Sequence, residues 1–173
     1  MTPEDKYSKP KPKMDEDIVT VMVNKIDGFK GEGLNQYKIC DLVEDAEKLG
    51  NKLVEKKLKT NQIRKFLDAV NRFKIEYGKT NIQPNEQPEI LLQILKEKRD
   101  ELHVLRYQLA YAAARQKKEK DPGPVEPLKK VLEAAIKQVR NENQDDFARD
   151  FARLVQLIES IVAYHKAAGG KDQ

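Results

Sequence analysis

The side chains in this sequence that could do chemistry are mainly basic. Residues 51–80 contain nine lysines or arginines against three acidic residues, although the whole chain of 173 residues has a net charge of only +4. Lys65 and Arg72 are seven residues apart, so a helix places both on one face, with Arg64 to one side. Such a cluster attracts polyphosphate backbones, because each contacted phosphate releases condensed counterions. The alternative is a lysine-rich helix face that only aids solubility, and charge alone leaves both interpretations open.

A second basic group ends segment 81–120, where Arg115, Lys117, Lys118 and Lys120 follow one another closely. We expect few exposed aromatic side chains, because the chain has no tryptophan and only 6% of its residues are aromatic. Nucleic-acid binding through these groups would therefore use contacts with the backbone rather than base stacking. It would be independent of base sequence.

Residues for catalysis or metal binding are few. His103 and His165 fall on different predicted helices, and each is expected at the surface or at the edge of the core. Cys40 lies next to apolar positions, which favours a small buried packing residue. The sequence has no glycine-rich phosphate loop, cysteine pair, His-x-x-x-His spacing or serine nucleophile motif. We therefore expect no enzyme activity, no cofactor and no metal site.

The elements that must position these residues are helices. Apolar residues recur at helical spacing in five segments, which are 35–57, 60–77, 88–119, 125–142 and 145–168. Most prolines and glycines fall between these segments or near their ends, and the short connections favour antiparallel packing. The sequence therefore predicts an all-α fold, an antiparallel bundle of about five helices with a flexible N-terminal tail.

Some helix ends and irregularities can also be predicted. Thr60 and Asn61 are candidate caps for the second of these helices, and Asp145 and Asp146 are candidates for the last. In the long third segment we expect a break or kink near His103.

The chain divides into a flexible or loosely packed N-terminal segment at 1–33, a helical domain at 34–170 and a tail at 171–173. Within the first of these, the β-branched stretch 18–26 could form a strand or a helical turn. A short helix or an adhering segment is favoured, because no partner strand is predicted elsewhere. No apolar run approaches the roughly 20 residues of a membrane span, and no signal peptide is recognisable, so we expect a cytoplasmic protein without a membrane partner.

Three blocks of the sequence resemble the small helical subunit of type III-A (Csm) CRISPR–Cas effector complexes. They read LKTNQIRKFLDAVNRFK at 58–74, LRYQLAYAAARQ at 105–116 and FARLVQLIESIVAYHKAAGG at 151–170. Their order and spacing match the family over roughly residues 40–170. Each block alone is a plain amphipathic helix, and the combination is more specific. Arg106-Tyr107 departs from the pattern, in which a Lys-Pro-like break would precede the Leu-Ala-Tyr block.

The resemblance implies a cytoplasmic, cofactor-free and non-catalytic subunit of a CRISPR effector complex, which stacks with copies of itself beside the other subunits. It would contact guide RNA and target RNA through basic helix faces, since base pairing reads the sequence in RNA-guided complexes. The best candidates for RNA contact on the matching positions are Arg64, Lys65, Arg72 and Arg115. Electrostatic support is expected from Lys52, Lys56, Lys57, Lys117 and Lys118.

Other readings of the same residues stay open. Arg64 could simply pair with Asp68 one helical turn away, and Arg115 could interact with the dipole at the end of its helix. A helical adaptor that binds only protein is the alternative function. A helix-turn-helix that reads DNA is disfavoured, because apolar residues fill the core face of 60–77 and no side chains are placed for base edges.

Overall fold

The computed structural model describes residues 16–79 and 88–172, and the regular elements in that part of the chain are helices. The six α-helices are α1 (Ile18–Asp27), α2 (Ile39–Glu55), α3 (Thr60–Lys79), α4 (Pro88–Gln116), α5 (Glu126–Lys137) and α6 (Gln144–Ala167). A short 3-10 helix, η1 (Leu34–Gln36), precedes α2. The predicted all-α class is confirmed, and the helix beyond the expected five is α1.

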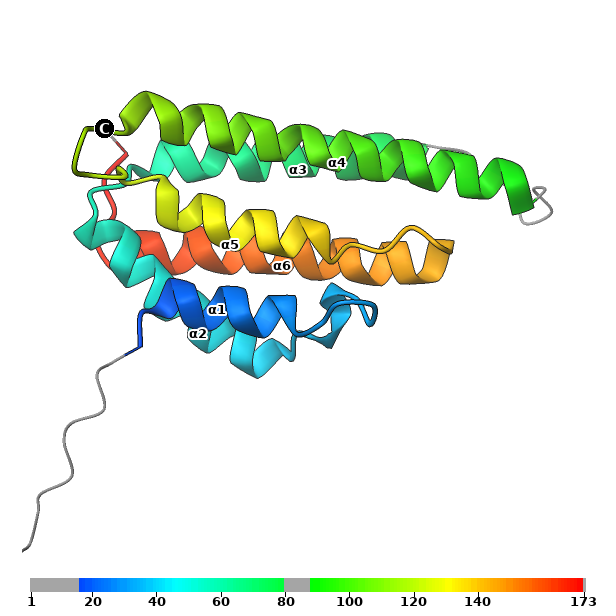
Figure 1. Cartoon of the computed structure of the whole chain (residues 1–173), viewed down its shortest axis with the longest axis horizontal. Coiled ribbons are helices and arrows are strands. Elements are labelled where there is room, and N and C mark those ends of the chain that lie inside the picture. The colour runs from blue at the N-terminus through cyan, green and yellow to red at the C-terminus, as the bar shows by residue number, and fades with distance from the viewer. Residues whose placement is uncertain (1–15, 80–87, 173) are drawn as a thin grey trace, which may run out of the picture.

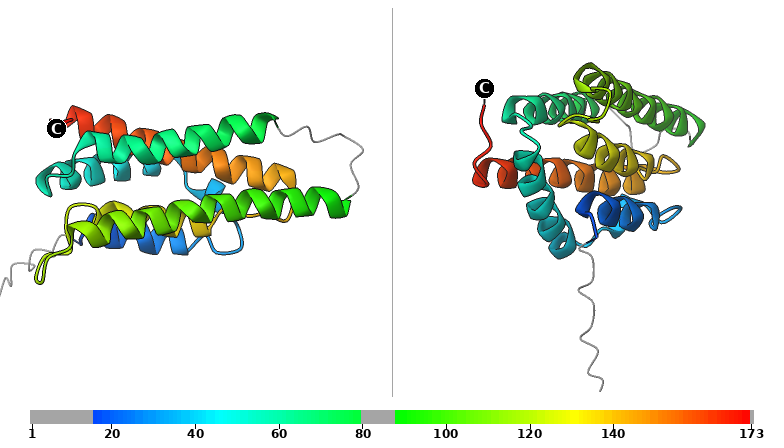
Figure 2. Two further views of the ribbon diagram at one scale, coloured as in Figure 1. Left: turned by 90° about the horizontal axis from the view of Figure 1, so that it is seen from above. Right: turned by 60° about the vertical axis from the view of Figure 1, so that its left-hand side comes forward.

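The helices form three layers (Figure 1). α5 and α6 lie in the middle, with α3 and α4 on one side and α1 and α2 on the other (Figures 1 and 2). α6 packs against both α2 and α3, while α5 packs against both α1 and α4. None of the helices in the described ranges is long and apolar enough to cross a membrane.

Helix α1 is part of the packed structure. Its Val19, Met22 and Ile26 follow helical spacing and are buried in the core. Lys25 on the same helix forms an ion pair with Asp45 of α2. The short helix favoured for 18–26 is therefore confirmed, and this part of the N-terminal segment is packed rather than loose because it carries an apolar face of its own. Residues 1–15, where the rest of the flexible tail was predicted, lie outside the described residues.

Two local predictions differ from the structure. α4 is one helix of 29 residues, so of the break or kink expected near His103 the break does not occur. Leu102, Leu105 and Leu109 continue a single buried stripe through that region, and no proline or glycine interrupts it. The cap of α6 is Asn143 rather than an aspartate, since its Oδ1 accepts a hydrogen bond of 2.8 Å from the backbone N–H of Asp146.

Helix α3, which carries the predicted basic cluster, is held at two places. Its buried side chains recur at helical spacing, and Phe73 contacts Phe151 of α6 with ring centroids 4.9 Å apart. At its first turn, the backbone N–H of Thr60 donates to the carbonyl oxygen of Lys171 at 2.9 Å. The Thr60 hydroxyl, expected to cap the helix, lies 3.2 Å from Nδ1 of the buried His165 instead. This packing fixes which face of α3 points to solvent.

Candidate nucleic-acid interface

The three basic residues predicted on α3 are exposed. Arg64, Lys65 and Arg72 all point away from the stripe that packs on α6. Arg64 has one ion-pair partner within the described residues, Asp172, at 3.8 Å. The alternative pair of Arg64 with Asp68 does not form. The positive charge of Arg64 is therefore only partly neutralised by Asp172, since both side chains are about half exposed.

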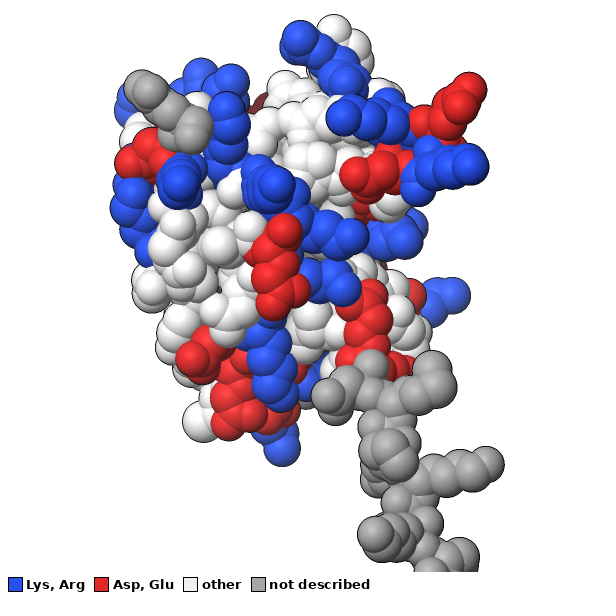
Figure 3. All heavy atoms as spheres, turned by 90° about the vertical axis from the view of Figure 1, so that its left-hand side faces the viewer, with Lys and Arg blue, Asp and Glu red and all other residues white. Residues whose placement is uncertain are grey.

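Most of the remaining predicted basic residues lie near the start of α3 or the end of α4. Figure 3 shows this end of the molecule, where Lys and Arg predominate in the upper half, over the α3 and α4 layer. We call this surface the basic end and define it by its exposed members, which are Lys56, Lys57, Lys59, Arg64, Lys65, Arg115, Lys117 and Lys118. Arg72 lies further along α3.

The turn between α2 and α3 brings three lysines to the basic end. Lys56 ends α2, and Lys57 adopts a positive φ of 60° that redirects the chain toward α3. A shallow hollow beside them is lined by Lys57, Lys59 and Lys171 together with the two glycines that follow α6. Segments far apart in sequence therefore add their charges in one place.

Three of the predicted supporting residues, Lys52, Lys117 and Lys118, differ in environment. Lys52 forms an ion pair with Asp17, so its charge is already neutralised locally. Lys117 and Lys118 are exposed in the turn after α4, where the backbone N–H of Lys118 donates to the carbonyl oxygen of Asp121 at 2.8 Å. The structure therefore places the second pair in the basic end and leaves Lys52 outside it.

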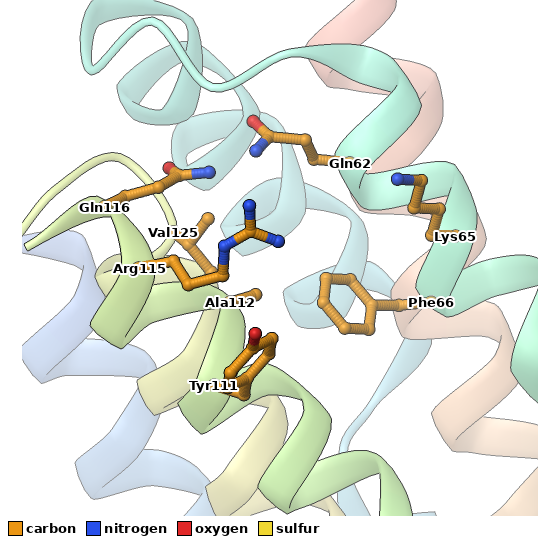
Figure 4. Close-up of a pocket in the computed structure, with 8 residues that line it drawn as sticks. All are labelled: Gln62, Lys65, Phe66, Tyr111, Ala112, Arg115, Gln116 and Val125. Atoms are coloured by element: carbon orange, nitrogen blue, oxygen red, sulfur yellow. The ribbon is translucent and has the colours of Figure 1, made fainter.

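A groove separates α3 from the end of α4 within this surface (Figure 4). Its volume is about 330 Å³. It is lined by Gln62, Lys65, Phe66, Tyr111, Ala112, Arg115, Gln116 and Val125. The first three belong to α3 and the next four to α4, and Val125 directly precedes α5.

Basic and aromatic groups meet in this groove, which we call the α3–α4 groove. The guanidinium carbon of Arg115 lies 5.7 Å from the centre of the Tyr111 ring. Figure 4 shows Arg115 extending from α4 into the groove and Gln62 reaching toward it from α3. No ion-pair partner for Lys65 or Arg115 lies within the described part of the chain. These two cations are therefore free to attract an anion from solution.

The expectation that exposed aromatic residues would be scarce was wrong on α4. Tyr107 and Tyr111 are 64% and 65% exposed, although most aromatic side chains elsewhere pack in the core. Both lie opposite the buried leucine stripe of α4, so their exposure follows from spacing along the helix. That spacing was the available signal for Tyr111, whereas nothing in the sequence indicated that Gln62, Phe66 and Gln116 would face it.

Three other titratable side chains are Cys40, His165 and Asp172. Cys40 is exposed rather than buried. His165 is fully buried, and burial lowers the pKa of its imidazole, an effect that nearby Lys166 reinforces and the hydrogen bond to Leu58 opposes. At the surface, the hydrogen bond from Lys166 lowers the pKa of the Asp172 carboxyl, and the charge of Arg64 acts in the same direction. Asp172 is therefore held as an anion beside the basic end.

Comparisons with known proteins give one match. A family model described as Csm2 Type III-A matches residues 36–171, which is most of the chain. No curated protein and no solved structure matches it. The matched range begins within η1 and extends beyond α6, so it includes the α3–α4 groove and every member of the basic end.

Proposed function

Because this chain belongs to the Csm2 Type III-A family, and is thus a subunit of a type III-A CRISPR effector complex that associates with other Csm subunits, we propose that it binds RNA through the basic end. In this proposal the subunit is non-catalytic and works in the cytoplasm. The guide RNA and the target RNA are its ligands, and neither is read by base sequence.

One observation supports the proposal most directly, namely the pair of unneutralised cations that face each other across the α3–α4 groove. Lys65 and Arg115 come from different helices, and neither has an ionic partner among the described residues. Isolated surface lysines are commonly solvated, but convergent cations from two helices produce a focused positive potential. A phosphodiester backbone supplies the regularly spaced anions that such a surface attracts.

The chemistry of RNA favours binding without sequence reading. In an RNA-guided complex, base pairing supplies the specificity, and the protein needs only to hold the strands by shape and charge. Lysine and arginine contacts to phosphate position a strand and carry no sequence information. Binding by the isolated chain should therefore be weak and should decline steeply as salt rises.

The experiment is a charge reversal with a matched control. We expect the triple variant Arg64→Glu, Lys65→Glu and Arg72→Glu to bind single-stranded RNA at least about 10-fold more weakly than wild type at about 50 mM salt. The control makes the same charge change at three other exposed lysines. Lys38 directly precedes α2, Lys48 is on α2 and Lys130 is on α5. It lowers the net charge equally and should retain most of the affinity.

The competing function is an adaptor that binds only protein. If it were correct, wild type and both triple variants would show the same negligible affinity for RNA while still entering the Csm complex. Equal loss in both triple variants would instead assign RNA binding to net charge rather than to the basic end.

We also propose that the subunit stacks with copies of itself and with its neighbours. Three apolar side chains on the α3 and α4 layer support this, since Ile75, Ile90 and Val104 are 58%, 46% and 38% exposed. Exposed apolar residues that gather in one place mark contact surfaces, and Ile75 near the end of α3 and Ile90 near the start of α4 lie at the same end of this layer (Figure 1). Sedimentation velocity over a concentration series tests it, because association should weaken when Ile75 and Ile90 are changed to Ser.

A further inference from the structure

We infer that the α3–α4 groove binds one unpaired nucleotide of an RNA strand, with its base stacked on Tyr111 and its phosphate held by Lys65 and Arg115. This inference rests on the proposed RNA-binding function. It adds a specific subsite to what would otherwise be contact with the backbone alone.

The ring of Tyr111 is the first part of the case. This side chain is 65% exposed, so one face is accessible to a ligand without any rearrangement of the core. Base-on-aromatic stacking contributes about 1–3 kcal/mol per base and tolerates every base type, because each has a π-face. Arg115 already lies 5.7 Å from the ring centre, and a guanidinium can stack on a base as well as on tyrosine.

The floor of the groove suits a base ring. Phe66 and Val125 are buried and Ala112 is partly buried, so the bottom of the groove is apolar. Figure 4 shows the Phe66 ring directed into the groove from α3. The groove volume of about 330 Å³ is at the low end of the range of about 300–1,000 Å³ that small-molecule sites span. It therefore fits one nucleotide and not a duplex.

The charges at the rim select an anion. Lys65 and Arg115 stand on opposite helices, and none of the described residues that line the groove carries a carboxylate. A phosphate on the ribose of the stacked nucleotide would lie between these two cations. A neutral apolar peptide would leave both cations without a counterion, so charge favours the nucleotide over a protein segment.

A polar group inside the groove supports the same occupant. Gln116 Oε1 is buried and has no hydrogen-bond partner among the described residues. Figure 4 shows the amide nitrogen of Gln116, rather than this oxygen, directed toward the groove, so its N–H groups can donate to an acceptor on a base edge. Gln62 on the facing helix offers a second amide to the same edge. Since an amide can present either its oxygen or its nitrogen, no single base is required.

The test is a cycle of two proteins and two strands. Wild type and Tyr111→Leu are titrated against a short single-stranded RNA and against a strand of equal length in which every nucleotide is abasic. Leucine keeps an apolar side chain at an exposed position and removes the stacking face. We expect the variant to bind the normal strand about 5- to 150-fold more weakly, and to bind the abasic strand within about twofold of wild type.

Tyr107→Leu is the matched control. Tyr107 has nearly the same exposure and lies one turn away on the same helix, but does not line the groove. Its affinity for both strands should stay within about twofold of wild type. A 2-aminopurine placed in the normal strand gives a direct signal, since its fluorescence should be quenched by wild type and by Tyr107→Leu but not by Tyr111→Leu.

The outcomes separate this inference from the proposed function. If wild type binds neither strand, RNA binding itself is wrong. If wild type binds both strands, three results would contradict the nucleotide subsite while RNA binding stands. The affinity of Tyr111→Leu could equal that of wild type, or it could fall equally on both strands. The third result is that Tyr107→Leu loses as much affinity for the normal strand as Tyr111→Leu does.

Discussion

Nε2 of the buried His165 lies 2.7 Å from the carbonyl oxygen of Leu58, so this imidazole nitrogen carries the proton and donates it. Nδ1, 3.2 Å from the Thr60 hydroxyl, is then the acceptor of a hydrogen bond from Thr60. The neutral ring with its proton on Nε2 satisfies both neighbours. A second proton would place a charge in a fully buried position and reverse the role of Nδ1. His165 thus joins α6 to the start of α3 in its neutral form.

This arrangement predicts a loss of stability on acidification. Burial lowers the pKa of His165 below its ordinary value of 6.5, with a further lowering by Lys166 and an opposing effect of the Leu58 hydrogen bond. Below about pH 6.5 the unfolded chain therefore binds more protons than the folded chain, and the free energy of unfolding decreases with falling pH. The stabilisation is complete above the unfolded pKa and disappears as the pH falls through the folded one.

Urea denaturation at a series of pH values measures this effect. His165→Gln should be less stable than wild type at pH values above about 7 and should show a weaker dependence between about pH 7 and 5. The difference between the two proteins isolates His165, because His103, whose pKa burial also lowers, is present in both. Parallel pH profiles would contradict the assignment.

A second prediction concerns the buried carboxylate of Asp150. Its Oδ1 accepts a hydrogen bond of 2.9 Å from the backbone N–H of Asn35, and its Oδ2 accepts one of 2.9 Å from Nε of Arg140. Asp150 is fully buried, so removing it leaves the backbone N–H groups of Asn35 and Arg140 without their acceptor and leaves Arg140 with Asp146 as its remaining ion-pair partner among the described residues. We expect Asp150→Ala to lower the free energy of unfolding by about 3–5 kcal/mol.

Denaturant unfolding with a nearby control checks this value. Asp145 is on the same helix and exposed, and Asp145→Ala should change stability by less than about 1 kcal/mol. A similar small effect for Asp150→Ala would show that the network around Arg140 contributes little to the junction of η1 with α6.

The fold could be predicted because apolar residues recur at helical spacing in every helix. The wrong predictions for Cys40 and for the cap of α6 have identifiable causes. Cys40 is two residues from Leu42, which is buried, and a two-residue step turns a side chain to the opposite side of a helix. The Asn143 cap was missed because the following pair of aspartates also fits a helix start. In each case the local pattern allowed two positions, and packing chose one.

The candidate interface was predictable only in part. Spacing on α3 alone places Lys65 and Arg72 in solvent, and the structure has both of them exposed. The α3–α4 groove depends on which helices become neighbours, since Gln62 and Tyr111 are far apart in the sequence. The spacing of apolar residues predicts the buried face of each helix but not the helix that packs against it. It could therefore not be predicted that Lys65 and Arg115 would line the same groove.

The ion pair between Lys52 and Asp17 leads to a third prediction, which ranks the basic residues. Lys52→Gln removes a charge that is already compensated, so RNA affinity should stay within about 1.5-fold of wild type. Lys65→Gln removes an uncompensated charge, and should weaken binding about two- to fivefold while reducing the slope of log affinity against log salt by about 0.7. Titrations at several salt concentrations measure both quantities. Equal effects of the two substitutions would show that net charge, rather than ion pairing or position in the basic end, determines each contribution.

The contact of α2 with α6 at Gly50 leads to the last prediction. A Cβ at this position would lie 2.8 Å from the backbone nitrogen of His165, and a backbone atom cannot move aside without shifting the helix. In a helix interior, replacing glycine with alanine normally stabilises by about 0.5–1 kcal/mol through backbone entropy. Gly50→Ala should instead destabilise by about 1–3 kcal/mol, because α2 and α6 must separate to admit the methyl group. Urea denaturation gives the sign directly, and a stabilised variant would mean that the two helices can part at this point without loss of packing.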